Sequence, residues 1–178
     1  LIVTHHRPDH VGLAGWFQKE YNASLWMTRT AWLMARMLCL DEQKTPPPET
    51  LEFWTRAGMR LDILEERKKG KPFNFADAVS ALPLGFRRIV DNEEFEIGNR
   101  VWKVRIGNGH APEQATLWST SDQIVLAGDQ IISSISPNLG VYATEPDANP
   151  VREWIDTCHK LSQFASDDHL SLIHISEP

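Results

Sequence analysis

Three histidines and an aspartate follow directly on a short apolar segment at the start of this chain. Residues 1–4 form a β-prone run, and the next six residues include His5, Asp9 and His10. A glycine-spaced segment compatible with a helix comes after them. A strand, a polar loop and a helix in this order hold side chains at the edge of a sheet. Because imidazole nitrogens combined with a carboxylate suit Zn²⁺, and also Fe²⁺ or Mn²⁺, the pattern predicts metal ligands at that edge.

Two further strand-like segments end in a residue that can bind a metal. His110 follows an apolar run and lies in a glycine-rich loop, 100 positions after His10. Asp129 follows the segment 124–128, in which four apolar residues end in a glycine. Three strand ends that each present a ligand predict one metal site assembled from distant parts of the chain.

The composition describes an ordinary globular protein. The chain has 178 residues, of which 42% are hydrophobic and 24% charged, which is enough for one domain with a real core. Its net charge of −6 argues against general affinity for nucleic acid or for an anionic membrane. The two cysteines, Cys39 and Cys158, are far apart; they could pair, but the sequence favours reduced thiols in a cytoplasmic protein.

The chain changes character near residue 86. Residues 18–90 are expected to be mostly helical, with a helix that runs from a cap at Asn22 or Ser24 to about Leu40. After the three prolines at 46–48, a second helical stretch is expected at 49–70, weakened at Gly58.

Later segments show a period of two, which indicates strands. The expected strands are 95–97, 101–106, 115–118 and 123–126, with a hairpin turn at 119–122. A last helix is expected at 149–164, with Asn149 as its N-cap and Pro150 at its first position.

These motifs resemble those of a known family. Residues His5 to His10 read His-His-Arg-Pro-Asp-His, which is similar to the H-x-H-x-D-H signature of the metallo-β-lactamase superfamily of hydrolases, with Arg7 at the position of the second histidine. The segments around His110 and Asp129 resemble the third-histidine and bridging-aspartate motifs, in the same order. Residues 135–150 resemble a glyoxalase II-like branch, and the resemblance extends to about Asp168.

The resemblance implies an α/β fold, an αββα metallo-β-lactamase-type sandwich with a helical insert at about 18–90. The domain is expected to occupy residues 1–170 and to be incomplete, without the opening strands and the C-terminal histidine strand of the family. Residues 171–178 resemble translated sequencing adapter and are expected to be a non-native tail. The family's last histidine has no secure match in residues 167–174, and no ligand is assigned there.

The resemblance also implies roles for the ligands. His5 and His110 would hold a first metal ion, Asp9 and His10 a second, and Asp129 would bridge the two. A guanidinium cannot ligate a cation, so Arg7 leaves one ligand position unfilled. His6 is interpreted as a non-ligand, although it could swing in to replace the missing imidazole.

The predicted function is hydrolysis of an ester, thioester or lactone by a metal-activated hydroxide, with one or two Zn²⁺ ions and with Asp9 orienting the hydroxide. Iron or manganese is possible in place of zinc. The expected partner is a small-molecule acyl substrate, with no nucleic acid and no membrane. Two alternatives stay open: a metal-poor member of the fold that only binds, and a di-iron domain of the flavoprotein oxygen reductase type.

Overall fold

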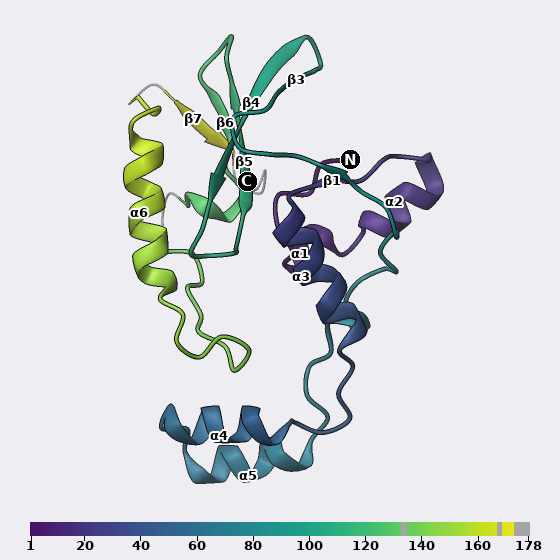
Figure 1. The fold of residues 1–178 in the computed structure, drawn as a ribbon, viewed down its shortest axis with the longest axis vertical. Coiled ribbons are helices and arrows are strands. Elements are labelled where there is room, and N and C mark those ends of the chain that lie inside the picture. Colours follow the sequence, from purple (N-terminus) through teal and green to yellow (C-terminus); the bar gives the residue numbers. More distant parts are fainter. Residues whose placement is uncertain (133–134, 167–168, 173–178) are drawn as a thin grey trace, which may run out of the picture.

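One five-stranded sheet organises the second half of the chain. The computed structural model describes residues 1–132, 135–166 and 169–172, the last three of these by their backbone alone. The strands follow one another in the order β3-β4-β5-β6-β7, antiparallel except for the parallel pair β6 and β7 (Figure 1). They are β3 (Glu94–Ile97), β4 (Arg100–Gly107), β5 (Gln114–Ser119), β6 (Ile124–Leu126) and β7 (Leu170–Leu172). The first four lie where the alternating pattern predicted strands.

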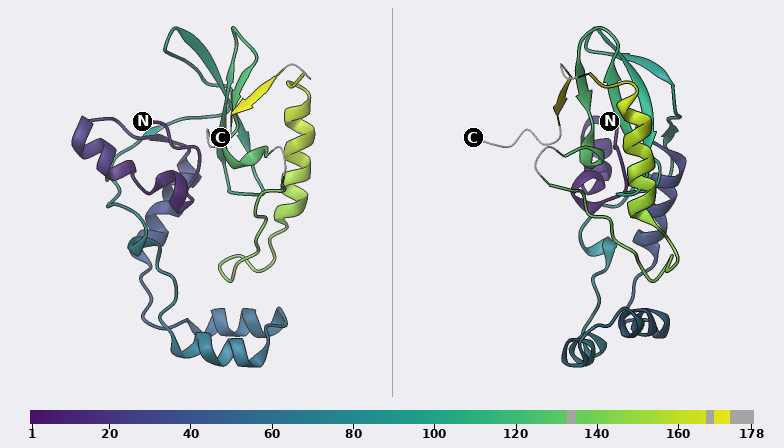
Figure 2. Two further views of the ribbon diagram at one scale, coloured as in Figure 1. Left: turned by 180° about the vertical axis from the view of Figure 1, so that it is seen from behind. Right: turned by 90° about the vertical axis from the view of Figure 1, so that its left-hand side faces the viewer.

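Helix α6 (Pro150–Ser162) packs against the outer side of this sheet (Figure 2). It begins as predicted, because the Asn149 side chain accepts a hydrogen bond from the Arg152 backbone N–H at 3.0 Å. Its buried Leu161 joins a small core with Trp118 and Val125 of the sheet. The helix thereby covers the sheet on the side away from the N-terminus.

The N-terminal residues lie between this sheet and a second, smaller one. The second sheet pairs β1 (Trp26–Met27) in parallel with β2 (Arg87–Arg88). Residues 1–4 run beside β1, where the Val3 N–H donates to the Trp26 carbonyl at 3.0 Å. On the other side, the Ala115 N–H of β5 donates to the Thr4 carbonyl at 2.9 Å. This segment therefore links the two sheets.

Three helices cover the second sheet: α1 (Pro8–Val11), α2 (Ala14–Tyr21) and α3 (Arg29–Leu40). Val11, Ala31 and Ala35 of these helices are fully buried in one core with residues of the N-terminal segment and β1. Helices thus lie outside both sheets, which is the α/β sandwich that the sequence predicted. No helix in the described ranges combines the length and apolarity needed to cross a membrane.

The predicted start of the helix that ends at Leu40 is wrong. Asn22 has φ 49° and closes α2 instead of opening α3. Leu25 and Met27 are buried in extended chain, because this segment pairs with residues 1–3 and with β2. The helix begins at Arg29, after Thr28, whose hydroxyl accepts a hydrogen bond from the Ala31 N–H at 3.3 Å. Tertiary pairing overrides the helix propensity of the earlier residues.

The stretch expected as one weakened helix is two helices. Helix α4 (Pro48–Arg56) and helix α5 (Leu61–Lys69) form a hairpin that turns at Gly58, where φ is 78°. Neither helix contains a buried residue, and Figure 1 shows the hairpin standing apart from the sheets. Residues 18–90 therefore supply a helical appendage in addition to the strands β1 and β2.

Two smaller expectations concern the cysteines and the end of the chain. Cys39 and Cys158 are both free, in agreement with the expectation of reduced thiols. Of the tail expected at 171–178, residues 171 and 172 belong to β7, whereas 173–178 are outside the described residues.

Gly109 gives a test of how tightly the loop between β4 and β5 is held. Its φ is 103°, and a Cβ there would lie 2.5 Å from the Trp154 Cβ and 2.6 Å from the Pro150 carbonyl oxygen. Gly109→Ala is expected to lower the free energy of unfolding by more than the roughly 1–2 kcal/mol that a positive φ alone costs. Gly58→Ala is the control, because Gly58 also has a positive φ but no atom within 4 Å of its Cβ position. Urea denaturation measures both variants, and equal losses would contradict this account of the packing.

Candidate metal centre

The loop that follows residues 1–4 brings the side chains of His5 and His10 close together. His5 follows Thr4 directly and is fully buried, with its Nδ1 3.0 Å from the Thr4 hydroxyl. Helix α1 begins at Pro8, and the Val11 N–H donates to the Arg7 carbonyl at 2.9 Å. This turn of helix returns the chain, so the rings of His5 and His10 lie 4.1 Å apart between centroids.

The loop between β4 and β5 supplies His110. Glu113 anchors this loop to helix α3, because its carbonyl accepts from the Thr28 hydroxyl at 2.8 Å and its carboxylate accepts from the Thr30 N–H at 3.0 Å. The His110 side chain is only 4% exposed. Its Nδ1 lies 3.0 Å from the backbone carbonyl of Asn138. The loop is therefore held from both sides of the molecule.

Asp129 follows strand β6 in a short 3-10 turn, η2 (Gly128–Gln130). Gly128 has φ 51°, which turns the chain sharply at the end of the strand. Gln130 is fully buried, and its carbonyl accepts from the Trp154 ring N–H at 3.1 Å. The aspartate is thus fixed between a glycine turn and a buried anchor.

The donor atoms of four predicted ligands meet within these loops. His110 Nε2 lies 3.2 Å from His5 Nε2 and 3.2 Å from Asp129 Oδ2. His10 Nε2 lies 3.3 Å from Asp129 Oδ1. His5, His10 and Asp129 each offer an atom within 4.8 Å of the other two. Residues that are far apart in the sequence therefore form one cluster.

The hydrogen bonds of His110 determine which ring nitrogen faces the cluster. A backbone carbonyl only accepts, so neutral His110 carries its proton on Nδ1, toward Asn138. Its Nε2 then presents a lone pair to His5 and to the Asp129 carboxylate. A metal ion among these atoms would accept the His110 lone pair and would have its charge balanced by the Asp129 carboxylate.

The spacing of these imidazole nitrogens and carboxylate oxygens also suits a metal ion. Ligands held about 2.0–2.1 Å from a tetrahedral ion lie roughly 3.3–3.4 Å from one another. His110 Nε2 lies 3.2 Å from both His5 Nε2 and Asp129 Oδ2, close to that edge length, and His10 Nε2 lies 3.3 Å from the other carboxylate oxygen, Oδ1. The cluster therefore has ligand types and spacings that suit a small divalent cation.

Burial and charge perturb the ionisation of the cluster. Burial, followed by the nearby His10 and His110, lowers the pKa of His5 from its usual 6.5 to about 2. A hydrogen bond from His10, followed by the influence of the neighbouring His110, holds the pKa of the Asp129 carboxyl well below its usual range. The site thus favours a neutral His5 imidazole and an ionised Asp129 carboxylate, which are the forms that bind metals.

The remaining residues of the first loop differ in exposure. The Asp9 side chain is 64% exposed, at the rim of the cluster, with its Oδ2 3.5 Å from His10 Nε2. His6 is buried, and its Nδ1 has no hydrogen-bond partner in the described part of the chain; its ring meets the His5 ring edge-on, with centroids 6.4 Å apart. Arg7 Nη2 donates to the His110 backbone carbonyl at 3.3 Å. Four of the five predicted ligands pack together, and Asp9 borders them.

Sequence reasoning missed two residues that orient the rings, Thr4 and Asn138. Thr4 stands immediately before the first histidine, so its place in the sequence gave a signal. Asn138 contributes a backbone carbonyl, which has no residue-specific signature. Near the C-terminus, the His169 ring lies 5.6 Å from that of Trp118, whereas Asp167, Asp168 and His174 are outside the described residues.

The family model of the metallo-beta-lactamase superfamily matches residues 1–168. The chain therefore belongs to this superfamily. No curated protein matches the sequence significantly.

Solved structures share the fold. A beta-lactamase domain protein from Burkholderia ambifaria is 28% identical with a TM-score of 0.80, over 99% of this chain and 50% of that one. A metallo-beta-lactamase family protein from Thermus thermophilus is 22% identical with a TM-score of 0.71, over 95% of this chain and 54% of that one. The protein TTHA1623 in a di-iron-bound form is 14% identical with a TM-score of 0.61, over 99% and 68%. The chain spans about half the length of the first two.

The buried histidines predict how stability depends on pH in the metal-free chain. Burial, and then the Arg7 cation, lower the pKa of His6 to about 4. Because His5 and His6 take up protons near pH 6.5 only when unfolded, the free energy of unfolding should fall as the pH drops from 6.5 toward 4. The expected slope is up to about 1.4 kcal/mol per pH unit for each of these histidines.

Urea denaturation at several pH values measures this slope. His6→Gln should reduce it, and His159→Gln, which changes an exposed histidine on α6, should not. A slope that is the same in His6→Gln and the unchanged protein would mean that His6 is not held neutral.

Proposed function

We propose that this member of the metallo-beta-lactamase superfamily is a metal-dependent hydrolase of an ester, thioester or lactone. The observation that carries the proposal is the buried meeting of His5 Nε2, His110 Nε2 and an Asp129 oxygen, with 3.2 Å from the His110 nitrogen to each of the other two. Two imidazole nitrogens and a carboxylate oxygen at this spacing suit a metal ion. His5, His10, His110 and Asp129 would hold it, with Asp9 at its border.

Zn²⁺ is the ion that we propose for the site. When bound, it supplies a Lewis acid that polarises the acyl oxygen and lowers the pKa of water to near 7. The chain's own residues prepare the site for it: the Asn138 carbonyl fixes the His110 ring, and the Thr4 hydroxyl contacts the His5 ring.

Asp9 is proposed to act on the nucleophilic water. Its carboxylate is 64% exposed and borders the buried donors, so it can orient a water molecule and accept its proton. The water oxygen then forms a bond to the acyl carbon while the bond from that carbon to the leaving oxygen or sulfur breaks. Asp9 passes the proton to the leaving oxygen or sulfur, and the products are a carboxylic acid and an alcohol or thiol.

A cavity beside the cluster suits the acyl part of such a substrate. It has a volume of about 510 Å³, and Asp9 and His10 form part of its wall. Most of the remaining wall is apolar, with Leu13, Phe17 and Val3 among its residues. An uncharged, apolar acyl group fits these walls, whereas a highly charged polymer such as nucleic acid does not.

The alternatives are separated by the metal that the chain holds. TTHA1623, a neighbour in fold, is known in a di-iron-bound form, which favours iron as the second candidate ion. A member that only binds ligands without catalysis would bind little metal, an interpretation favoured by Arg7 beside the cluster. Elemental analysis of the purified protein distinguishes zinc, iron and no metal.

Substitutions of the ligands test the proposal. Asp129→Asn and His10→Ala should each weaken zinc binding at least tenfold, because each removes a donor from the cluster. Hydrolysis of a panel of p-nitrophenyl esters, thioesters and lactones should fall with it. Asp122→Asn, which changes a carboxylate paired with Arg100 far from the cluster, is the matched control. Zinc affinity unchanged in Asp129→Asn would refute the assignment.

Asp9 should behave differently from the buried ligands. Asp9→Asn keeps the four packed donors, so the protein should retain zinc. Its hydrolytic kcat should nevertheless fall by roughly 10²–10⁴, the usual contribution of a general base. If Asp9→Asn lost zinc and activity together, Asp9 would be a metal ligand and not a general base.

A further inference from the structure

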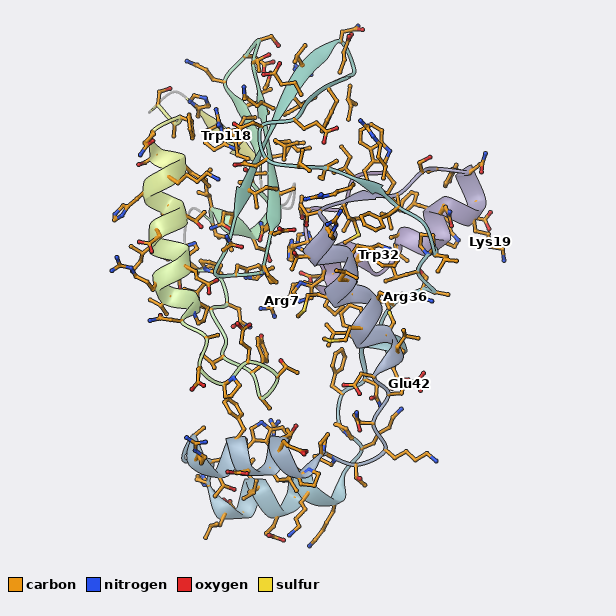
Figure 3. The ribbon with its side chains drawn as sticks, in the orientation of Figure 1. Arg7, Lys19, Trp32, Arg36, Glu42 and Trp118 are labelled. Carbon is orange, nitrogen blue, oxygen red and sulfur yellow. The ribbon has the colours of Figure 1, made fainter. Side chains whose placement is uncertain are left out.

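Arg7 brings a permanent positive charge to the edge of the donor cluster. It lies between His5 and Asp9 in the sequence, and its guanidinium donates to the backbone carbonyl of His110 at 3.3 Å. Figure 3 shows Arg7 between the N-terminal helices and the sheet half of the molecule. The side chain thus spans the junction at which the ligand loops meet.

The guanidinium has hydrogen-bonding capacity that the described residues do not use. Arginine has five N–H donors, and the His110 carbonyl accepts from one of its terminal nitrogens. Arg7 Nε is buried and has no hydrogen-bond partner in the described part of the chain. The guanidinium carbon lies 5.8 Å from the centre of the Tyr142 ring. The face of this ring can attract the cation but carries no negative charge. A buried donor without an acceptor is costly, so this arrangement points to an anionic ligand.

The charge of the cluster limits how many metal ions it accepts. Its carboxylates are Asp129 and, at the rim, Asp9. These two negative charges balance one divalent ion. A second divalent ion would be repelled by the positive charge of Arg7, which no carboxylate of the cluster compensates. It would also lack a ligand, because the Arg7 guanidinium cannot bind a cation.

We propose that the chain binds one divalent ion, held jointly by His5, His10, His110 and Asp129, and that Arg7 binds a carboxylate of the ligand beside that ion. The proposal rests on the proposed function, because it takes the cluster to be a metal site. A carboxylate is the fitting partner, because its two oxygens match the paired N–H groups of a guanidinium. Substrates that carry a carboxylate near the bond to be cleaved are therefore the class that this site selects.

Zinc stoichiometry tests the first half of the proposal. The full chain is freed of metal with a chelator, titrated with zinc, gel-filtered and analysed for metal content. The unchanged protein and Arg7→Lys should each hold one zinc. Arg7→His, which removes the fixed charge and adds a ligand, should hold two. Arg152→His, on the exposed side of α6, should stay at one. Two zinc ions in the unchanged protein would overturn this inference and leave the proposed function standing, whereas no zinc would overturn the proposed function.

Benzoate binding tests the second half. Calorimetric titration should show that benzoate binds to the metal-free and the zinc-loaded protein, and that benzamide, its neutral counterpart, binds at least tenfold more weakly. Arg7→Gln should weaken benzoate binding at least tenfold in both forms, and Arg7→Lys by less, because lysine keeps the charge but not the paired donors. Circular dichroism confirms that each variant is folded. Equal benzoate affinity in Arg7→Gln and the unchanged protein would contradict the role of Arg7.

Discussion

The hydrogen bond from the Ala115 N–H to the Thr4 carbonyl, 2.9 Å long, joins the two halves of this molecule. It attaches the N-terminal segment to strand β5 of the large sheet. His5 is the next residue after Thr4, and His110 stands in the loop that leads into β5. The bond therefore fixes the register in which the two histidines face each other. The contacts of Thr28 with Glu113 and of Arg7 with His110 cross the same junction.

The cluster formed at this junction opposes the stability of the metal-free fold. His5, whose pKa burial lowers, and the largely covered Asp129 carboxylate each lie 3.2 Å from His110 Nε2. Such an arrangement persists only because packed elements on every side hold it, among them the buried Gln130 anchor and the α3–Glu113 contact. A bound cation would interact with these groups, so ligand binding and folding are linked through the same few atoms.

Much of the fold follows from patterns in the sequence, and the exceptions have a common cause. The strands β3 to β6 and the start of α6 at Asn149 were predictable, because alternation and capping are local properties. The start of α3 at Thr28 was not, because Leu25 and Met27 are extended only through pairing with distant strands. The turn between α4 and α5 depends on a positive φ at Gly58. A glycine can adopt a positive φ but is not obliged to, so the sequence alone did not predict the turn.

The same division applies to the site. Imidazoles and carboxylates at three strand ends predicted which residues meet, because such side chains are recognisable in sequence. The Asn138 carbonyl that orients His110 could not be predicted, since every residue has a backbone carbonyl and only the tertiary structure selects one. The burial of His5, which sets its ionisation, likewise depends on both halves of the molecule.

The central claim is that the loops after three strand ends form one metal centre. Crystals of the zinc-loaded protein, measured with X-rays on either side of the zinc absorption edge, test it most directly. The account predicts an anomalous peak bounded by His5, His10, His110 and Asp129, with metal–nitrogen distances of about 2.0–2.1 Å. The absence of a peak there, or a peak that contacts none of these residues, would contradict it.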